Sequence, residues 1–132
     1  MAATAATRLL LDTHAFLWWR SAPRRLGPDA RKVIAEAEIV FVSMASAWEA
    51  EIKVSIGKLS LESRFEDGVS ESGFQPLPIK FRHIDRLSSL PLLHRDPFDR
   101  MLIAQALADG LTIITEDRRI AGYEVAHLPA GM

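Results

Sequence analysis

Acidic residues from four distant segments are the clearest chemical signal in this 132-residue sequence. Asp12 and Asp117 each follow a short apolar run, whereas Glu49 and Asp99 fall in segments with helical patterning. Carboxylates brought together repel one another and raise one another's pKa, so a divalent cation is their natural neutraliser. Oxygen ligands favour Mg²⁺ or Mn²⁺. Such an ion activates water and stabilises phosphoryl charge, so the pattern indicates phosphodiester chemistry.

Length and composition indicate one soluble domain over residues 1–132, with residues 1–7 expected to be a loose N-terminal leader. The composition is 48% hydrophobic and 25% charged, and no apolar run is long enough to span a membrane. Cysteine is absent, which excludes disulfides and thiolate metal sites and suits the cytoplasm. Any bound metal is therefore expected to have oxygen ligands.

The net charge of -1 argues against nucleic-acid binding through bulk positive charge. Local arginines would have to supply the phosphate contacts. Arg100 and Arg118 flank the acids of the segment 94–119 and are weak candidates for that role. Salt bridges to the carboxylates are an equally good interpretation of both side chains.

Short apolar strands alternate with helical segments along the chain, which predicts a single α/β domain. The central sheet should be mostly parallel, with about five strands flanked by helices. Its expected strands are residues 8–11, 39–42, 74–79, 111–114 and 123–128, and its expected helices are 13–20, a segment from Pro28, 43–56, 59–73, 80–90 and 97–110, with 129–132 as a tail. Ligands bind at the carboxyl ends of parallel strands. Asp12, Ser43 and Asp117 should therefore share one sheet edge.

Helix boundaries place the remaining acids. Asp96 is expected to cap the helix that Pro97 starts, with Asp99 three residues beyond the cap and Gly110 at the helix end. Capping is the favoured interpretation of Asp96, although an indirect role beside the ligands remains open. Neighbours on an extended chain point opposite ways, so only one of Glu116 and Asp117 should face the cleft.

Four segments resemble the PIN-domain ribonucleases, and more narrowly the VapC-type toxins of type II toxin–antitoxin systems. They are LLLDTH at 9–14, SMASAWE at 43–49, HRDPFDRMLIAQA at 94–106 and LTIITED at 111–117. The resemblance implies that Asp12, Glu49, Asp99 and Asp117 are catalytic metal ligands. It also implies polar support from Thr13, Ser43 and Thr115. Family members cleave RNA with Mg²⁺ or Mn²⁺, commonly form homodimers, and are held inactive by a cognate VapB-like antitoxin.

Histidines and tryptophans are interpreted more conservatively. The residues His14, His83, His94 and His127 have no metal-ligand spacing and are expected to pack or hydrogen-bond. For Trp18, Trp19 and Trp48, core or dimer contacts are favoured over stacking on bases.

Two other magnesium-dependent classes fit poorly. A phosphoacceptor receiver domain would need paired acids after the first strand, and a haloacid-dehalogenase-like phosphatase would need a second Asp where His14 stands. The main alternative is a catalytically silent PIN-like scaffold that binds RNA or a protein partner. Intact acids at all four positions argue against it.

Overall fold

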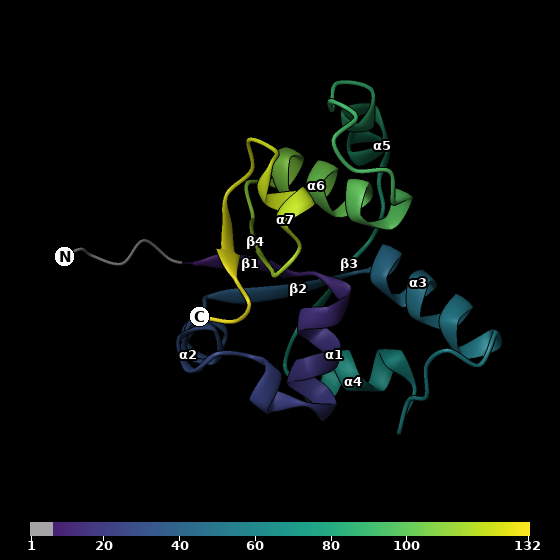
Figure 1. Cartoon of the computed structure of the whole chain (residues 1–132), viewed down its shortest axis with the longest axis vertical. Helices are drawn as coiled ribbons and strands as arrows, with labels where there is room; N and C mark the ends of the chain where they lie inside the picture. The colour runs from purple at the N-terminus through teal and green to yellow at the C-terminus, as the bar shows by residue number, and fades with distance from the viewer. Residues whose placement is uncertain (1–6) are drawn as a thin grey trace.

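A parallel sheet of five strands forms the centre of the computed structural model, which describes residues 7–132 (Figure 1). The strands are β1 (Arg8–Leu11), β2 (Ile39–Ser43), β3 (Gln75–Leu77), β4 (Thr112–Thr115) and β5 (His127–Pro129), in the order β3-β2-β1-β4-β5. Every strand pair is parallel. This arrangement confirms the predicted α/β fold class.

Helices cover both faces of the sheet (Figure 1). Their bounds are α1 (Thr13–Ser21), the 3-10 helix η1 (Pro23–Arg25), α2 (Pro28–Glu36), α3 (Met44–Ser55), α4 (Phe65–Glu71), α5 (Phe81–Leu87), α6 (Pro97–Asp109) and α7 (Arg118–Ala121). Figure 1 shows α1, α2 and α4 on one face and α5, α6 and α7 on the other.

The central strand β1 separates two hydrophobic cores. Leu9 and Leu11 pack with Phe16 on one face, whereas Leu10 packs with Leu102 and Ile113 on the other. A strand alternates its side chains between the two faces, so an uninterrupted leucine run suits a strand that is covered on both. β1 is also where the strand order reverses, and such a switch point opens a crevice beyond the strand ends.

The weaker sequence predictions needed correction. Only Phe65–Glu71 is helical within the predicted helix 59–73, because the serines before it favour turns. The predicted strand 123–128 is shifted to His127–Pro129. The expected tail is packed, with Ala130 buried and its N–H donating to the Thr115 carbonyl. The predicted leader, residues 1–7, lies outside the described residues except for Thr7.

Helix α7 was not predicted, and it directly follows Asp117. Its four residues are too few to show a helical hydrophobic period. Across residues 7–132 no helix has both the length and the apolar character needed to span a membrane.

Candidate active site

All four predicted acids line one cleft of about 460 Å³ at the carboxyl ends of the strands. The cleft is lined by Asp12, His14, Trp18, Arg25, Glu49, Lys53, Asp96, Asp99, Glu116, Asp117 and Arg119. Parallel pairing aligns Leu11 of β1 with Ile114 of β4, so the residues that follow these strands emerge side by side. The fold therefore brings together side chains that are more than 100 positions apart in the sequence.

Asp12 is held rigidly at the end of β1. One carboxylate oxygen accepts the Ala15 N–H at 2.8 Å, which caps α1, and the other accepts the Thr115 hydroxyl at 2.6 Å. Burial raises the pKa of Asp12 above its usual value, against the lowering effect of these hydrogen bonds. A cation in the cleft would favour the charged form. Thr115 thus occupies the supporting position that the sequence suggested.

Glu49 reaches the cleft from the second turn of α3. The Thr13 hydroxyl donates to Glu49 Oε1 at 2.7 Å and lies 2.9 Å from the Ser46 hydroxyl oxygen. Lys53, one helical turn further along, places its ammonium 3.3 Å from Glu49 Oε2. These contacts orient a buried carboxylate. Ser43 caps α3 by accepting the Ala45 N–H, as its place at the start of this helix predicts, and it does not line the cleft, so its supporting role stays a prediction.

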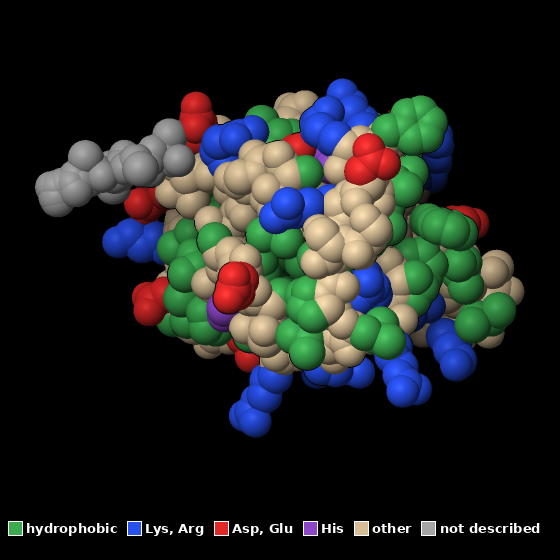
Figure 2. Space-filling view, turned by 90° about the horizontal axis from the view of Figure 1, so that it is seen from above, with side chains coloured by type: hydrophobic (Ala, Val, Ile, Leu, Met, Phe, Trp, Pro, Cys, Tyr) green, Lys and Arg blue, Asp and Glu red, His purple; other side chains and the backbone are tan. Residues whose placement is uncertain are grey.

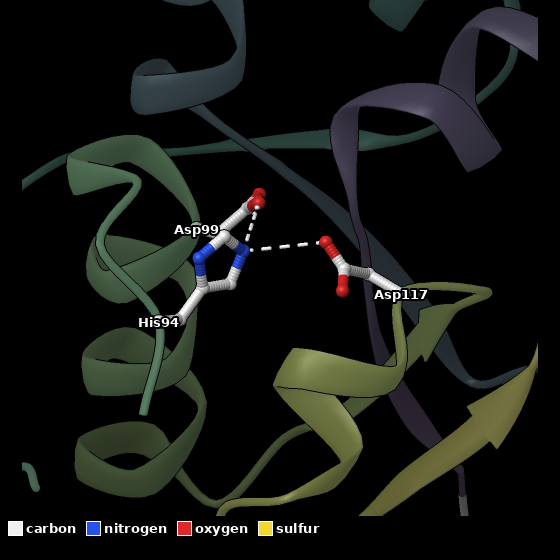
Figure 3. Close-up of side chains that lie close together, drawn as sticks. All are labelled: His94, Asp99 and Asp117. Atoms are coloured by element: carbon white, nitrogen blue, oxygen red, sulfur yellow. Dashed lines mark hydrogen bonds and ion pairs between the residues drawn. The ribbon is translucent and has the colours of Figure 1, made fainter. Parts of the chain in front are cut away.

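Asp99 from α6 and Asp117 from the start of α7 both lie beside one ring nitrogen of His94 (Figure 3). His94 Nε2 lies 2.8 Å from Asp99 Oδ2 and 3.2 Å from Asp117 Oδ2. Burial, followed by the charge of Asp96, raises the pKa of Asp99 to about 7. Burial also opposes ionisation of Asp117, but hydrogen bonds from Arg119 outweigh it and lower the pKa of Asp117.

Asp96 combines the two interpretations that the sequence left open. Its carboxylate accepts the N–H groups of Phe98 and Asp99, at 2.8 and 3.1 Å, and so caps α6. It also lines the cleft and raises the pKa of Asp99 through its charge. Glu116 is exposed and accepts the Gly131 N–H, but it lines the cleft together with Asp117, so the prediction that only one of these two neighbours would face the cleft is wrong.

Arg100 and Arg118, the two weak candidates for phosphate contacts, both lie outside the lining of the cleft. The Arg100 guanidinium donates to the Pro91 carbonyl and the Tyr123 hydroxyl, both at 3.1 Å, and does not line the cleft. Its placement favours a structural role over the predicted phosphate contact. Arg118 is exposed at the start of α7 but also does not line the cleft. The cations that do line it are Arg25, Lys53 and Arg119.

His94 is the site residue that sequence reasoning undervalued. The sequence predicted packing or hydrogen bonding, and the structure shows hydrogen bonding to two of the four acids. Spacing could not reveal this contact, because His94 precedes its helix and reaches Asp99 by folding back over the cap. The only available signal was its place at the start of the HRDPFD segment.

The fold and acidic cleft are those of a PIN domain, and comparison with known proteins establishes the family. Residues 9–126 match the PIN domain model, so the chain belongs to the PIN-domain family. It is 32% identical to Ribonuclease VapC22 of Mycobacterium tuberculosis (strain ATCC 25618 / H37Rv) over 124 residues, which cover 89% of this chain and 92% of that protein. The family resemblance noted in the sequence is therefore confirmed.

Solved structures of low sequence identity share the fold. One is a chain of VapBC2 from Rickettsia felis bound to a promoter DNA fragment, with a TM-score of 0.67 and 12% identity, covering 93% of this chain and 98% of that one. Another belongs to a toxin–antitoxin complex from Klebsiella pneumoniae, with a TM-score of 0.64 and 17% identity, covering 97% and 100% of the two chains.

The donor set of the cleft fits a hard divalent cation. Asp12, Glu49, Asp99 and Asp117 all offer carboxylate oxygens, the ligands that Mg²⁺ and Mn²⁺ prefer. The raised pKa values of Asp12 and Asp99 show that burial disfavours their charged forms. A cation would relieve that cost.

Proposed function

We propose that this protein is a VapC-type toxin that hydrolyses RNA phosphodiester bonds with the aid of Mg²⁺ or Mn²⁺, in the cytoplasm. The observation that carries the proposal is the convergence of Asp12, Glu49, Asp99 and Asp117 in one cleft. Family membership and the similarity to a ribonuclease support the same activity. The four acids are proposed as the catalytic metal ligands, with Thr13 and Thr115 orienting two of them.

The side chains of the cleft have separable roles in this proposal. A divalent ion on the acids would supply an activated water and neutralise charge on the scissile phosphate. Thr115 and the Ala15 N–H hold Asp12, and Thr13 holds Glu49, so both carboxylates are preorganised. Lys53 lies beside Glu49 and offers a positive charge to the phosphate. The cleft thus combines acids for the metal with cations for the RNA backbone.

Purified protein, free of any antitoxin, should cleave RNA when Mg²⁺ or Mn²⁺ is added and should stop when the ion is chelated. The assay should follow defined single-stranded and structured RNAs on denaturing gels, because the four acids do not indicate which class of RNA is preferred. Cleavage that persists in chelator would contradict the metal requirement. A protein that binds these RNAs but leaves all of them intact with both ions would favour the silent-scaffold alternative.

Arg25→Ala should weaken RNA binding without removing a metal ligand. Arg25 lines the cleft, and its guanidinium carbon lies 5.2 Å from the Trp18 ring centroid, an arrangement that positions the charge. Loss of one phosphate contact should raise KM several-fold and reduce the salt slope of binding by about 1. Binding and cleavage should be titrated against RNA at several salt concentrations.

The neighbouring residue gives a matched control for this arginine. Arg24 is exposed in the same 3-10 helix but does not line the cleft. Arg24→Ala should therefore leave KM and the salt slope close to those of the wild type. Equal effects from the two substitutions would mean that Arg25 contributes only general surface charge.

A VapB-like antitoxin and a second copy of the chain are the proposed protein partners. The solved structures of similar fold include VapBC and other toxin–antitoxin complexes, which supports an antitoxin. Figure 2 shows hydrophobic side chains on the side of the molecule that carries α3 and α5. The exposed large hydrophobic residues of α3, its C-cap and α5 are Met44, Trp48, Ile52, Ile56, Phe81 and Ile84. The exposure of Trp48, at 61%, fits the predicted dimer contact better than a core position.

A further inference from the structure

We propose that His94 is a positioning residue whose Nε2–H bridges the carboxylates of Asp99 and Asp117, and that it is not itself a metal ligand. The three side chains lie close enough for a cation to be held by all of them, so a nitrogen ligand is the competing interpretation. The inference rests on the proposed metal-dependent function and assigns this histidine a role within it. Figure 3 shows the ring reaching between the two acids.

The backbone decides which ring nitrogen carries the proton. The Asp96 N–H points at His94 Nδ1 with an N···N distance of 3.2 Å, so Nδ1 accepts and carries no hydrogen. In a neutral imidazole the proton then lies on Nε2. That nitrogen faces oxygens of two carboxyl groups, which accept hydrogen bonds in their ionised form. A metal ligand would need a lone pair on Nε2, and this tautomer leaves none.

The backbone that carries the His94 ring is also held in place by hydrogen bonds. The His94 N–H donates to the buried Tyr123 hydroxyl at 2.9 Å, and the same hydroxyl accepts the Leu93 N–H at 3.1 Å. Arg100 donates to this oxygen as well, at 3.1 Å. These contacts fix the loop before α6, and the ring itself is 2% exposed. His94 is therefore a well-fixed donor within hydrogen-bonding distance of both carboxylates.

Bridging matters because Asp99 and Asp117 come from different elements. Asp99 lies in the first turn of α6, and Asp117 lies between β4 and α7. The shared Nε2–H keeps the Oδ2 atoms of both residues within hydrogen-bonding distance of one nitrogen. The remaining lone pairs of the two carboxylates stay available to a cation. Hydrogen-bond partners of metal-ligating groups change metal affinity or activity by about 10–100-fold when they are removed.

The chain contains a matched control in His83. Its ring is fully buried, its Nδ1 accepts the Lys80 N–H at 3.0 Å, and its Nε2 lies 3.0 Å from Asp109 Oδ2. The local chemistry repeats that of His94. His83, however, contacts none of the four acids of the site, because its Nε2 faces Asp109, which does not line the cleft. Substitutions at His83 therefore report the structural cost of losing a buried histidine without touching the acids.

Mn²⁺ binding to the full-length protein should be measured by calorimetry for the wild type, His94→Leu, His94→Gln and His83→Leu. We expect His94→Leu to weaken binding by about 10–100-fold. His94→Gln should recover most of the affinity, because its amide offers N–H donors at a similar reach. His83→Leu should lower the melting temperature and leave the Mn²⁺ affinity unchanged.

Other results would overturn the inference. Equal losses for His94→Leu and His94→Gln would indicate a nitrogen ligand, and unchanged affinity in both would indicate that the ring only fills space. Long-range ¹H–¹⁵N spectra provide an independent test, with Nε2–H expected in the metal-free and the Mg²⁺-loaded protein, and Nδ1–H contradicting the bridge. Wild-type protein that binds no Mn²⁺ would instead refute the proposed function, and the positioning role would fall with it.

Discussion

Asp99→Asn should reduce RNA cleavage by at least about 10²–10³-fold, comparable to the loss of a preorganised charge-stabilising group in other enzymes. Asp99 lies within hydrogen-bonding distance of His94 and lines the cleft with the other acids. Asparagine retains the shape but removes the negative charge that the proposed cation requires. Single-turnover cleavage at saturating Mg²⁺ measures the effect directly, and Asp12→Asn should behave in the same way.

The Asp99→Asn variant should remain folded. Burial and the charge of Asp96 raise the pKa of Asp99, so the metal-free protein loses nothing when that carboxylate becomes neutral. Its melting temperature should equal or exceed that of the wild type. Asp85→Asn, an exposed position on α5, is the control and should cleave normally. Asp99→Asn protein that keeps more than about a tenth of the wild-type rate would remove Asp99 from the catalytic set.

Phe16→Ala should lower the free energy of unfolding by about 3–5 kcal/mol, the usual cost of deleting a buried aromatic ring. Phe16 is 2% exposed, and its ring centroid lies 4.9 Å from that of Phe65 and 6.3 Å from that of Phe74. It joins α1, α4 and the segment before β3, so no small local shift can fill the cavity. Urea unfolding followed by circular dichroism measures the change.

Phe81→Ala makes the same chemical change at a position that is 83% exposed. It should alter the free energy of unfolding by less than about 0.5 kcal/mol when the chain is monomeric. A loss from Phe81→Ala as large as that from Phe16→Ala would contradict the burial pattern. Measurements at low protein concentration keep any dimer contact of this surface out of the comparison.

Strong local patterns made most of the fold predictable. The apolar run at residues 8–11 predicted strand β1, and Asp96, Pro97 and Gly110 marked the bounds of α6. Each signal acts on the local backbone, so tertiary packing did not override it. Gly110, for example, ends α6 with a φ of 69°, which glycine adopts without a steric penalty. The segments that were misplaced, residues 59–64 and 123–126, lack such signals.

The candidate site was likewise predictable only in part. The sequence alone supplied the four acids, and it placed Asp12 and Asp117 at one edge of the sheet, because parallel strands present the residues that follow them at the same edge. Only the tertiary structure decided which neutral and basic side chains surround them. Lys53 and Arg25 line the cleft and His94 contacts two of its acids through the packing of loops and helix faces, whereas Arg100 is drawn away to Tyr123. Such contacts depend on where the side chains of distant elements point. The spacing of residues along the sequence does not give that information.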